Sequence, residues 1–242
     1  MKIPIIFIEI FLLISFLKAS HKDYPVAISG SSDKTIKLFC LSEGIKIRTM
    51  SSHSSTVNSV VISEDGMKAL SGSNDMTLKY WNLVTGECIR TLTGHDKSVL
   101  SVSISRDGNF GFSGSSEDSC LKYWDLETGN CLRSWKSSNM SNNGVDISPD
   151  GNFGLSCGSD NKIDYWNLIT GDLIRTMTGH ILSVSSVVFS PDGRYALSAS
   201  FDATLKYWDL STGECIRTMS GHNLHVNSAV ISYDGLYALS GG

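Results

Sequence analysis

The sequence has few of the features that accompany a metal site, nucleic-acid binding or a disulfide-bonded fold. Its six cysteines form no Cys-x-x-Cys pair, which argues against zinc ribbons and thioredoxin-type redox sites. A chain of 242 residues needs no disulfide framework, so we expect reduced, packed cysteines. Charged residues make up 18% and the formal net charge is −4, which gives no strong attraction to nucleic acid or to an anionic membrane. The sequence therefore predicts no metal, no cofactor and no nucleic-acid partner.

The one apolar segment of note is short for a membrane span. The run from Ile3 to Leu17 fits a secretory signal peptide, although Glu9 interrupts it. Ser15–His21 also aligns with Val57–Ser63, so the apolar segment 1–20 is alternatively a degenerate first strand, and a mispredicted start codon is a third interpretation. Any membrane contact would be through this segment. The balance slightly favours a cytoplasmic location over export or anchoring.

One stretch, LKYWDLSTGECIRTMSGH at 205–222, recurs along the chain. Four related copies precede it, at 36–53, 78–95, 121–138 and 163–180. The fourth position of all five copies carries an aromatic residue, in steps of 42, 43, 42 and 42 residues: Phe39, Trp81, Trp124, Trp166 and Trp208. Asp-Gly pairs repeat with the same steps. A period of this length is typical of stacked supersecondary units.

Each unit reads as four short strands, and no segment keeps a helical period. In the unit that begins near 184, strands are expected at 184–190, 195–198, 204–209 and 214–219, separated by turn residues. The 22 glycines and only 4 prolines fit many strands joined by polar turns. Four-stranded meanders cannot bury both faces alone, so they stack radially. We therefore predict an all-β fold: a β-propeller of four-stranded antiparallel blades, with about five and a half blades present.

The predicted propeller covers residues 21–242. Its blades are expected near 21–50, 51–93, 94–136, 137–178, 179–220 and 221–242, the last one incomplete. Truncation of a longer propeller is the leading interpretation, and an open arc that associates or a strained six-bladed ring are the others. Because an unpaired half-blade exposes sheet edges, self-association through the incomplete blade is one expected partnership.

The repeats resemble the WD-repeat family of β-propellers from about residue 24 onward. The resemblance rests on the Gly-His that opens a unit, the Ser-x-Asp-Gly turn, the Ala-Leu-Ser-Gly-Ser-x-Asp segment and the closing Trp-Asp or Trp-Asn. Unit 1 departs from this pattern with Phe39-Cys40, and unit 4 departs with Ser137-Ser138. The resemblance implies a scaffold for protein–protein interactions, with other proteins or peptides as partners.

Histidine, serine, aspartate and tryptophan recur at fixed offsets in the full units. Residues of these types also build hydrolytic triads, but an enzyme needs one asymmetric site, and this set appears three times. The resemblance implies a structural hydrogen-bond chain in which Asp holds His, His reaches Ser, and Ser meets the indole N–H. The members are His53, Ser71, Asp75 and Trp81; His95, Ser113, Asp118 and Trp124; and His180, Ser198, Asp202 and Trp208. Unit 6 begins the set with His222 and Ser240, and unit 4 keeps Ser156, Asp160 and Trp166.

Resemblance to the family also implies a partner-binding face, made by the loops before the inner strand and before the aspartate. The candidates on this face are Asn74, Asp96, Lys97, Glu117, Ile181, Leu182, Phe201, Leu224 and His225. Ile181, Leu182 and Phe201 are large and apolar, as interface anchors are. The alternative is that these side chains fold inward over their blade or contact a missing one.

One arginine lies on the expected outermost strand of each of the first five units. A column of this kind is typical of a solvated rim, which we prefer to a nucleic-acid track. Its members are Arg48, Arg90, Arg133, Arg175 and Arg217.

The leading functional hypothesis is a non-catalytic protein-interaction scaffold. The alternative is the repeat portion of a larger regulatory or signalling enzyme. A propeller hydrolase that acts in its central channel is less favoured, because the polar residues repeat symmetrically.

Overall fold

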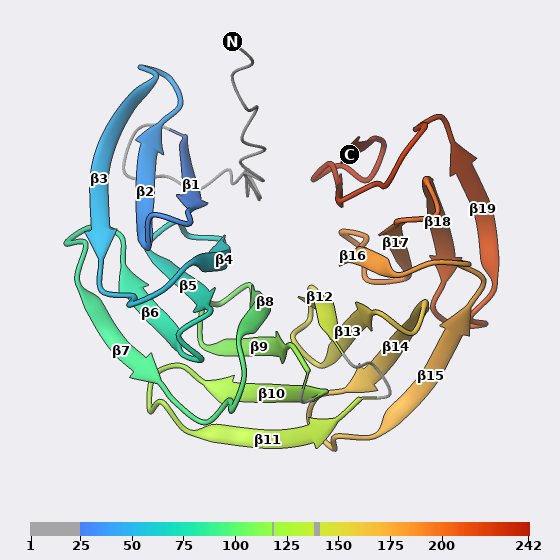
Figure 1. The fold of residues 1–242 in the computed structure, drawn as a ribbon, viewed down its shortest axis with the longest axis horizontal. Coiled ribbons are helices and arrows are strands. Elements are labelled where there is room, and N and C mark those ends of the chain that lie inside the picture. Colours follow the sequence, from blue (N-terminus) through green and yellow to red (C-terminus); the bar gives the residue numbers. More distant parts are fainter. Residues whose placement is uncertain (1–24, 118, 138–140) are drawn as a thin grey trace, which may run out of the picture.

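Six antiparallel β-sheets follow one another along the chain and stand side by side around an open arc (Figure 1). The computed structural model describes residues 25–117, 119–137 and 141–242. Every regular element within these residues is a strand, and four of the six sheets are four-stranded and antiparallel. The predicted all-β fold of four-stranded blades is confirmed.

The strands of blades 1 to 3 are as follows. Blade 1 has β1 (Val26–Gly30), β2 (Thr35–Cys40) and β3 (Ile45–Ser51). Blade 2 has β4 (Val57–Ile62), β5 (Lys68–Ser73), β6 (Leu78–Asn82) and β7 (Cys88–Leu92). Blade 3 has β8 (Val99–Ile104), β9 (Phe110–Ser115), β10 (Cys120–Asp125) and β11 (Cys131–Lys136).

Blades 4 to 6 continue the arc. Blade 4 has β12 (Asn142–Ile147), β13 (Phe153–Gly158), β14 (Lys162–Asn167) and β15 (Leu173–Thr178). Blade 5 has β16 (Val184–Phe189), β17 (Tyr195–Ser200), β18 (Thr204–Asp209) and β19 (Cys215–Ser220). Blade 6 has β20 (Ser228–Ile231) and β21 (Ala238–Gly241).

Within each blade the strands form a simple meander. Figure 1 shows β4, β8, β12 and β16 nearest the centre of the arc, and β7, β11, β15 and β19 at its outer rim. The Asp-Gly turns join the first two strands of a blade. In blade 2, Ser63 Oγ donates to Asp65 Oδ1 at 2.6 Å, and Gly66 takes a φ of 69°, which glycine adopts without strain. The recurring Ser-x-Asp-Gly sequence thus folds locally into the turn.

The hydrophobic core lies between neighbouring blades rather than within one sheet. Trp81 of blade 2 is 1% exposed and packs in one cluster with Ile28, Leu38 and Met50 of blade 1. Burial of a tryptophan side chain stabilises the fold by about 5 kcal/mol, at ~25 cal/mol per Å² over ~200 Å². Each blade therefore depends on the next for its core.

A row of arginines also joins neighbouring blades, which the sequence-based interpretation of a solvated rim missed. In blade 1, Arg48 donates from Nη1 to Thr85 O at 2.7 Å and from Nη2 to Val84 O at 2.9 Å, in the outer turn of blade 2. The next three arginines do the same, with the pairs Arg90–Glu127, Arg133–Ile169 and Arg175–Ser211. The rim is therefore a chain of hydrogen bonds between blades.

The two ends of the arc are the three-stranded sheet of blade 1 and the two-stranded sheet of blade 6, and no strand of the described residues joins them (Figure 1). The apolar segment 1–20 and the degenerate strand that is one alternative for 15–21 lie outside the described residues. Among the residues that the structure describes, none forms a helix long and apolar enough to cross a membrane.

Candidate protein-interaction face and buried polar relays

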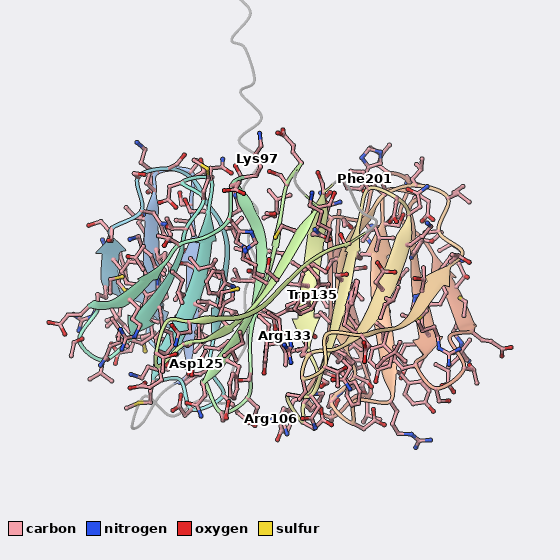
Figure 2. The ribbon with its side chains drawn as sticks, turned by 90° about the horizontal axis from the view of Figure 1, so that it is seen from below. Lys97, Arg106, Asp125, Arg133, Trp135 and Phe201 are labelled. Atoms are coloured by element: carbon pink, nitrogen blue, oxygen red, sulfur yellow. The ribbon has the colours of Figure 1, made fainter. Side chains whose placement is uncertain are left out.

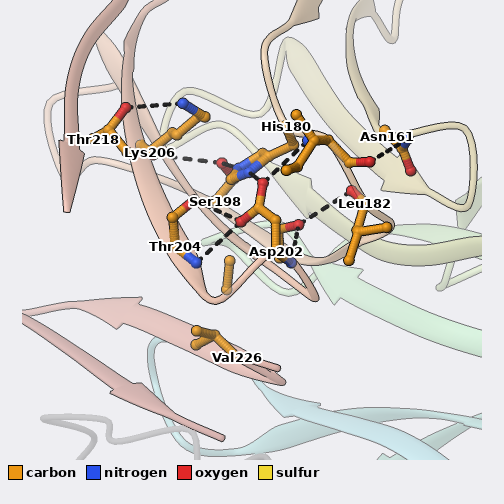
Figure 3. Close-up of polar contacts among 12 residues, drawn as sticks. Asn161, His180, Leu182, Ser198, Asp202, Thr204, Lys206, Thr218 and Val226 are labelled. Atoms are coloured by element: carbon orange, nitrogen blue, oxygen red, sulfur yellow. Dashed lines mark hydrogen bonds and ion pairs between the residues drawn. The ribbon is translucent and has the colours of Figure 1, made fainter. Parts of the chain in front are cut away.

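Blade 5 holds a complete chain of hydrogen bonds from an aspartate to a tryptophan. His180 Nδ1 lies 2.8 Å from Asp202 Oδ2, and His180 Nε2 lies 2.7 Å from Ser198 Oγ (Figure 3). The indole of Trp208 donates to the same serine oxygen at 2.9 Å. Thr204 fixes the other carboxylate oxygen of Asp202, donating from Oγ1 at 2.6 Å.

Blade 2 repeats this Asp-His-Ser-Trp chain of hydrogen bonds, here called a relay, almost atom for atom. His53 Nδ1 lies 2.7 Å from Asp75 Oδ2, and His53 Nε2 lies 2.7 Å from Ser71 Oγ. Trp81 donates to Ser71 Oγ at 2.9 Å. Since an ionised carboxylate only accepts, the histidine donates from Nδ1 and receives the serine proton at Nε2. Every polar atom of the serine and imidazole is therefore used.

The relay shifts the pKa values of its members. Burial lowers the pKa of His53 below the ordinary value of 6.5, although the neighbouring Asp75 carboxylate acts in the opposite direction. Burial alone would raise the pKa of Asp75, but hydrogen bonds from Thr77, the Ser54 amide and His53 outweigh it and lower the pKa to about 2. Asp202 behaves in the same way, with a pKa of about 2. The relay at neutral pH is thus a neutral imidazole beside a carboxylate.

The other blades hold parts of the relay. In blade 3, His95 Nε2 lies 2.8 Å from Ser113 Oγ, which also accepts the Trp124 indole at 2.9 Å; Asp118 lies outside the described residues. In blade 4, Trp166 donates to Ser156 at 2.9 Å, and serine replaces the histidine in the sequence. In blade 6, His222 Nε2 lies 2.8 Å from Ser240 Oγ.

The serines of the relays are closed to substrates. Ser71 and Ser198 are each 0% exposed, and each oxygen already bonds both an imidazole and an indole. No group of three or more His, Cys, Asp or Glu among the described residues could hold a metal ion. No disulfide bond joins the six cysteines, all of which lie in the described part of the chain. The relays can fix backbone loops, and their buried serine oxygens are out of reach of an acyl donor.

Two of the predicted binding residues, from different blades, lie on the same face of the arc. Figure 2 shows Lys97 of blade 3 and Phe201 of blade 5 at the same face, with Arg106 at the opposite face. Phe201 stacks on His225 with ring centroids 4.5 Å apart and planes 15° apart. The loop before β16 exposes 77% of Ile181, and the loop before β20 exposes 78% of Leu224.

The polar candidates lie in blades 2 and 3, and three of them make local contacts. Lys97 Nζ lies 3.3 Å from Glu117 Oε2, and both side chains are exposed. Asn74 accepts a hydrogen bond from the Asn58 amide at 2.7 Å. Asp96 is exposed in the loop before β8. The candidates thus divide into an apolar group in blades 5 and 6 and a polar group in blades 2 and 3.

Sequence reasoning missed Asp146, which lies on the innermost strand of blade 4. Its carboxylate accepts a hydrogen bond from Ser103 Oγ of blade 3 at 2.9 Å and from the Phe189 amide of blade 5 at 2.8 Å. Burial raises the pKa of Asp146 to about 6, and these hydrogen bonds offset the effect only partly. The signal in the sequence was an aspartate where blades 2 and 5 carry Val61 and Val188.

An arc of antiparallel blades, four of them four-stranded, that pack on one another through buried tryptophans defines a β-propeller built of sequence repeats. A family model for the WD domain, G-beta repeat, matches residues 44–82, 86–125, 129–167, 171–209 and 213–242. These matches cover more than half of the chain, so the protein belongs to the WD40 repeat family, as the repeat motifs predicted. Such repeats make domains of the protein-interaction scaffold kind. The comparison with curated protein sequences finds no match.

The matched segments straddle the blades. The segment 171–209 contains the outer strand of blade 4, β15, and then β16, β17 and β18 of blade 5. One sequence repeat therefore links two blades covalently, and the tryptophan that ends it packs against the blade before.

Proposed function

We propose that the protein is a non-catalytic scaffold that binds other proteins through an apolar patch on its loop face. The patch consists of Ile181, Leu182, Phe201, Leu224 and His225. The observation that carries the proposal is the exposure of its aliphatic members: 77% for Ile181, 48% for Leu182 and 78% for Leu224. Contiguous exposed apolar side chains on a folded domain favour a protein partner.

The relay of blade 5 fixes the loop that carries the patch. Asp202 Oδ2 accepts from the Ile181 amide at 3.1 Å, and Asn161 Nδ2 donates to Ile181 O at 3.2 Å. Ser200 Oγ donates to Leu182 O at 3.1 Å. A loop held at both peptide groups loses little conformational entropy when it binds, so the patch is preorganised.

The chemistry of the patch favours a protein over a nucleic acid. None of its members carries a fixed positive charge, and Lys97 on the same face pairs with Glu117. Phosphate contacts need Lys or Arg side chains that are free to replace counterions. A partner segment with aliphatic or aromatic side chains fits the patch better.

The proposal is tested by comparing two variants on the same face. Leu182→Ala with Phe201→Ala should weaken capture of a partner that wild type retains by about tenfold or more, because truncation of interface anchors costs about 1–2 kcal/mol each. Lys97→Ala with Glu117→Ala is the matched control and should retain capture. Both should melt like wild type. Equal capture by the patch variant and wild type would reject the patch.

A further inference from the structure

A groove lies between blades 3 and 4, at the face opposite the apolar patch, and its cavity measures about 670 Å³. Blade 3 contributes the turn 105–107 and residues of β9, β10 and β11, and blade 4 contributes the turns 149–152 and 168–169. Figure 2 shows one lining residue, Arg106, at the face opposite Phe201 of the patch. The groove is thus built from two four-stranded blades in the middle of the arc.

Much of the lining of this groove is apolar. Phe110 stacks on Tyr123, with ring centroids 5.5 Å apart and planes 18° apart. Leu132 and Ile169, which also line the groove, are 44% and 55% exposed. Exposed aliphatic side chains beside an aromatic pair favour contact with an apolar group of a partner.

The groove also contains a buried hydroxyl without a hydrogen bond. Between blades 2 and 3, the hydroxyl of Tyr80 donates to Gly108 O in the next Asp-Gly turn at 3.0 Å. Tyr123 and Gly151 are the equivalent residues between blades 3 and 4, and both line the groove. Tyr123 is 3% exposed, and its hydroxyl makes no hydrogen bond with any described residue. Because buried polar groups are nearly always paired, this hydroxyl favours a ligand that offers an acceptor.

The face around the groove is acidic. In blades 2 to 5, the turns that join the first two and the last two strands lie at this face, and each holds an Asp or a Glu. Arg106 and Arg194 are the only basic residues in these described turns. Arg106 is paired, since its Nε lies 2.9 Å from Glu64 Oε2. Asp107 and Asp150, which line the groove, are exposed.

Both of these aspartates are ionised at neutral pH. Burial alone would raise the pKa of Asp107, but hydrogen bonds from Ser105 and Asn109 outweigh it and lower the pKa below the ordinary value of 3.8. The pKa of Asp150 is lowered in the same way. Two carboxylates at an apolar groove attract cationic side chains and repel nucleic acid and anionic lipid. The charge therefore complements a basic polypeptide.

We propose that this groove binds an extended basic segment of another protein through one large apolar side chain. That side chain packs against the Phe110 ring and the Leu132 side chain. The Tyr123 hydroxyl donates to a backbone carbonyl of the segment, and flanking Lys or Arg side chains lie beside Asp107 and Asp150. The protein then has two binding faces of different chemistry, one apolar and one acidic.

Since the groove and the apolar patch lie at opposite faces, this proposal can succeed or fail independently of the patch. The probes are two fluorescein-labelled peptides, Lys-Gly-Lys-X-Lys-Gly-Lys, in which X is Phe or Gly. Anisotropy with the 242-residue chain should show saturable binding of the Phe peptide. The Gly peptide should bind at least about tenfold more weakly, because a buried aromatic anchor dominates such contacts.

Variants of the apolar lining locate the peptide. Leu132→Ala with Ile169→Ala should weaken binding by about fivefold or more, since both contact the anchor side chain. Ile216→Ala is the control at the position of blade 5 equivalent to Leu132, where the side chain is 51% exposed, and should bind like wild type. Tyr123→Phe should weaken binding by about threefold or more through the loss of one hydrogen bond. Tyr80→Phe is its control, because that hydroxyl already bonds within the protein.

The charge of the groove is tested separately. Asp107→Asn with Asp150→Asn should weaken binding by about threefold or more at low salt, and asparagine still supports the turns. Binding by wild type should fall when NaCl is raised from about 50 mM to about 300 mM, and binding by this variant should fall less. Thermal melts of the groove variants should agree with wild type, which separates lost binding from lost folding.

Four results would overturn the proposal. One is the absence of saturable binding at peptide concentrations up to about 1 mM, a range that includes weak peptide contacts. Another is equal binding of the Phe and Gly peptides, which would leave only a diffuse attraction between charges. A third is unchanged binding by the Leu132 and Ile169 double variant and by Tyr123→Phe. The fourth is loss of binding in Leu182→Ala with Phe201→Ala, which should bind like wild type and would otherwise place the peptide at the opposite face.

Discussion

The ring of Trp135 lies 5.8 Å from the ring of Trp166, tilted by 56°. Histidines hold the same relation to the tryptophans of blades 2 and 5, with His53 6.2 Å from Trp81 at 59°. Blade 4 is the full blade in which serine replaces that histidine. Trp135 comes from the outer strand of blade 3, where blades 1, 2, 4 and 5 carry Met50, Leu92, Met177 and Met219. The larger ring thus provides an aromatic contact with Trp166 in a blade without the histidine.

Trp135→Leu should therefore destabilise the protein more than a similar substitution at the equivalent position of another blade. We expect a loss of about 1–3 kcal/mol in the free energy of unfolding, because the indole leaves a cavity beside Trp166. The loss is smaller than for a fully satisfied indole, since Nε1 of Trp135 is buried with no hydrogen-bond partner among the described residues. Met177→Leu, a volume-conserving change, is the control at less than about 1.5 kcal/mol. Urea unfolding measures both, and equal losses would contradict the role of Trp135.

Ser71→Ala should cost more than Ser156→Ala. The first change leaves two buried groups without a hydrogen-bond partner, the Trp81 indole and His53 Nε2. The second leaves only the Trp166 indole without one. Each buried group without its hydrogen bond costs about 1–3 kcal/mol, so the two variants should differ by about 1 kcal/mol or more. Chemical denaturation at pH 7.5 measures the difference. Identical stabilities would mean that the histidine link contributes nothing.

Gly86→Ala should be more destabilising than Gly44→Ala, although both glycines have positive φ angles, of 80° and 68°. The left-handed conformation costs alanine about 1–2 kcal/mol at either site. At Gly86 the added methyl group would also overlap the Arg48 side chain that clamps this turn, while nothing lies within 4 Å at Gly44. Arg48→Met in the Gly86→Ala background should recover little of the lost stability. The second substitution relieves the overlap, but it also removes the hydrogen bonds from Arg48 to the turn. Melting temperatures of the three variants and wild type would show this order, and a milder Gly86→Ala would contradict it.

The architecture was open to prediction because it repeats. Five aromatic landmarks and five Asp-Gly turns in step define the blades, and each turn folds through contacts within a few residues, such as Ser63 with Asp65. The relay residues could be named from resemblance to the family, because each member recurs at a fixed offset. A single sequence therefore predicts contacts between residues close along the chain and positions that recur at fixed offsets.

The features that the sequence did not predict depend on contacts between blades. Arg48 binds carbonyl groups in a turn some 36 or 37 residues away, and backbone acceptors leave no signature in the sequence. Trp135 and Asp146 are single departures from the repeat, and each makes its contacts with neighbouring blades. A column of equivalent residues shows that a position matters, but only the packing shows which neighbour it meets.

Asp146 joins the innermost strands of three blades, and its protonation should be visible in the stability of the whole arc. Its pKa is raised from the ordinary value of 3.8 to about 6, so the folded protein holds this proton more tightly than the unfolded chain. No charged side chain is among the causes of the shift, which is due to burial. The stabilising contribution is therefore complete below pH ~4 and is lost as the pH rises through ~6.

Asp146→Asn tests this linkage, because asparagine keeps the shape and two hydrogen-bonding atoms without titrating. The free energy of unfolding of the variant, relative to wild type, should rise by about 1–3 kcal/mol between pH 4 and pH 7. The histidine and aspartate relays titrate equally in both proteins, so their contributions cancel in the difference. Urea unfolding at four or five pH values measures it, with Asp209→Asn as the control for an exposed carboxylate that should show no such rise. A difference that stays constant across this range would show that Asp146 is ionised throughout in the folded protein.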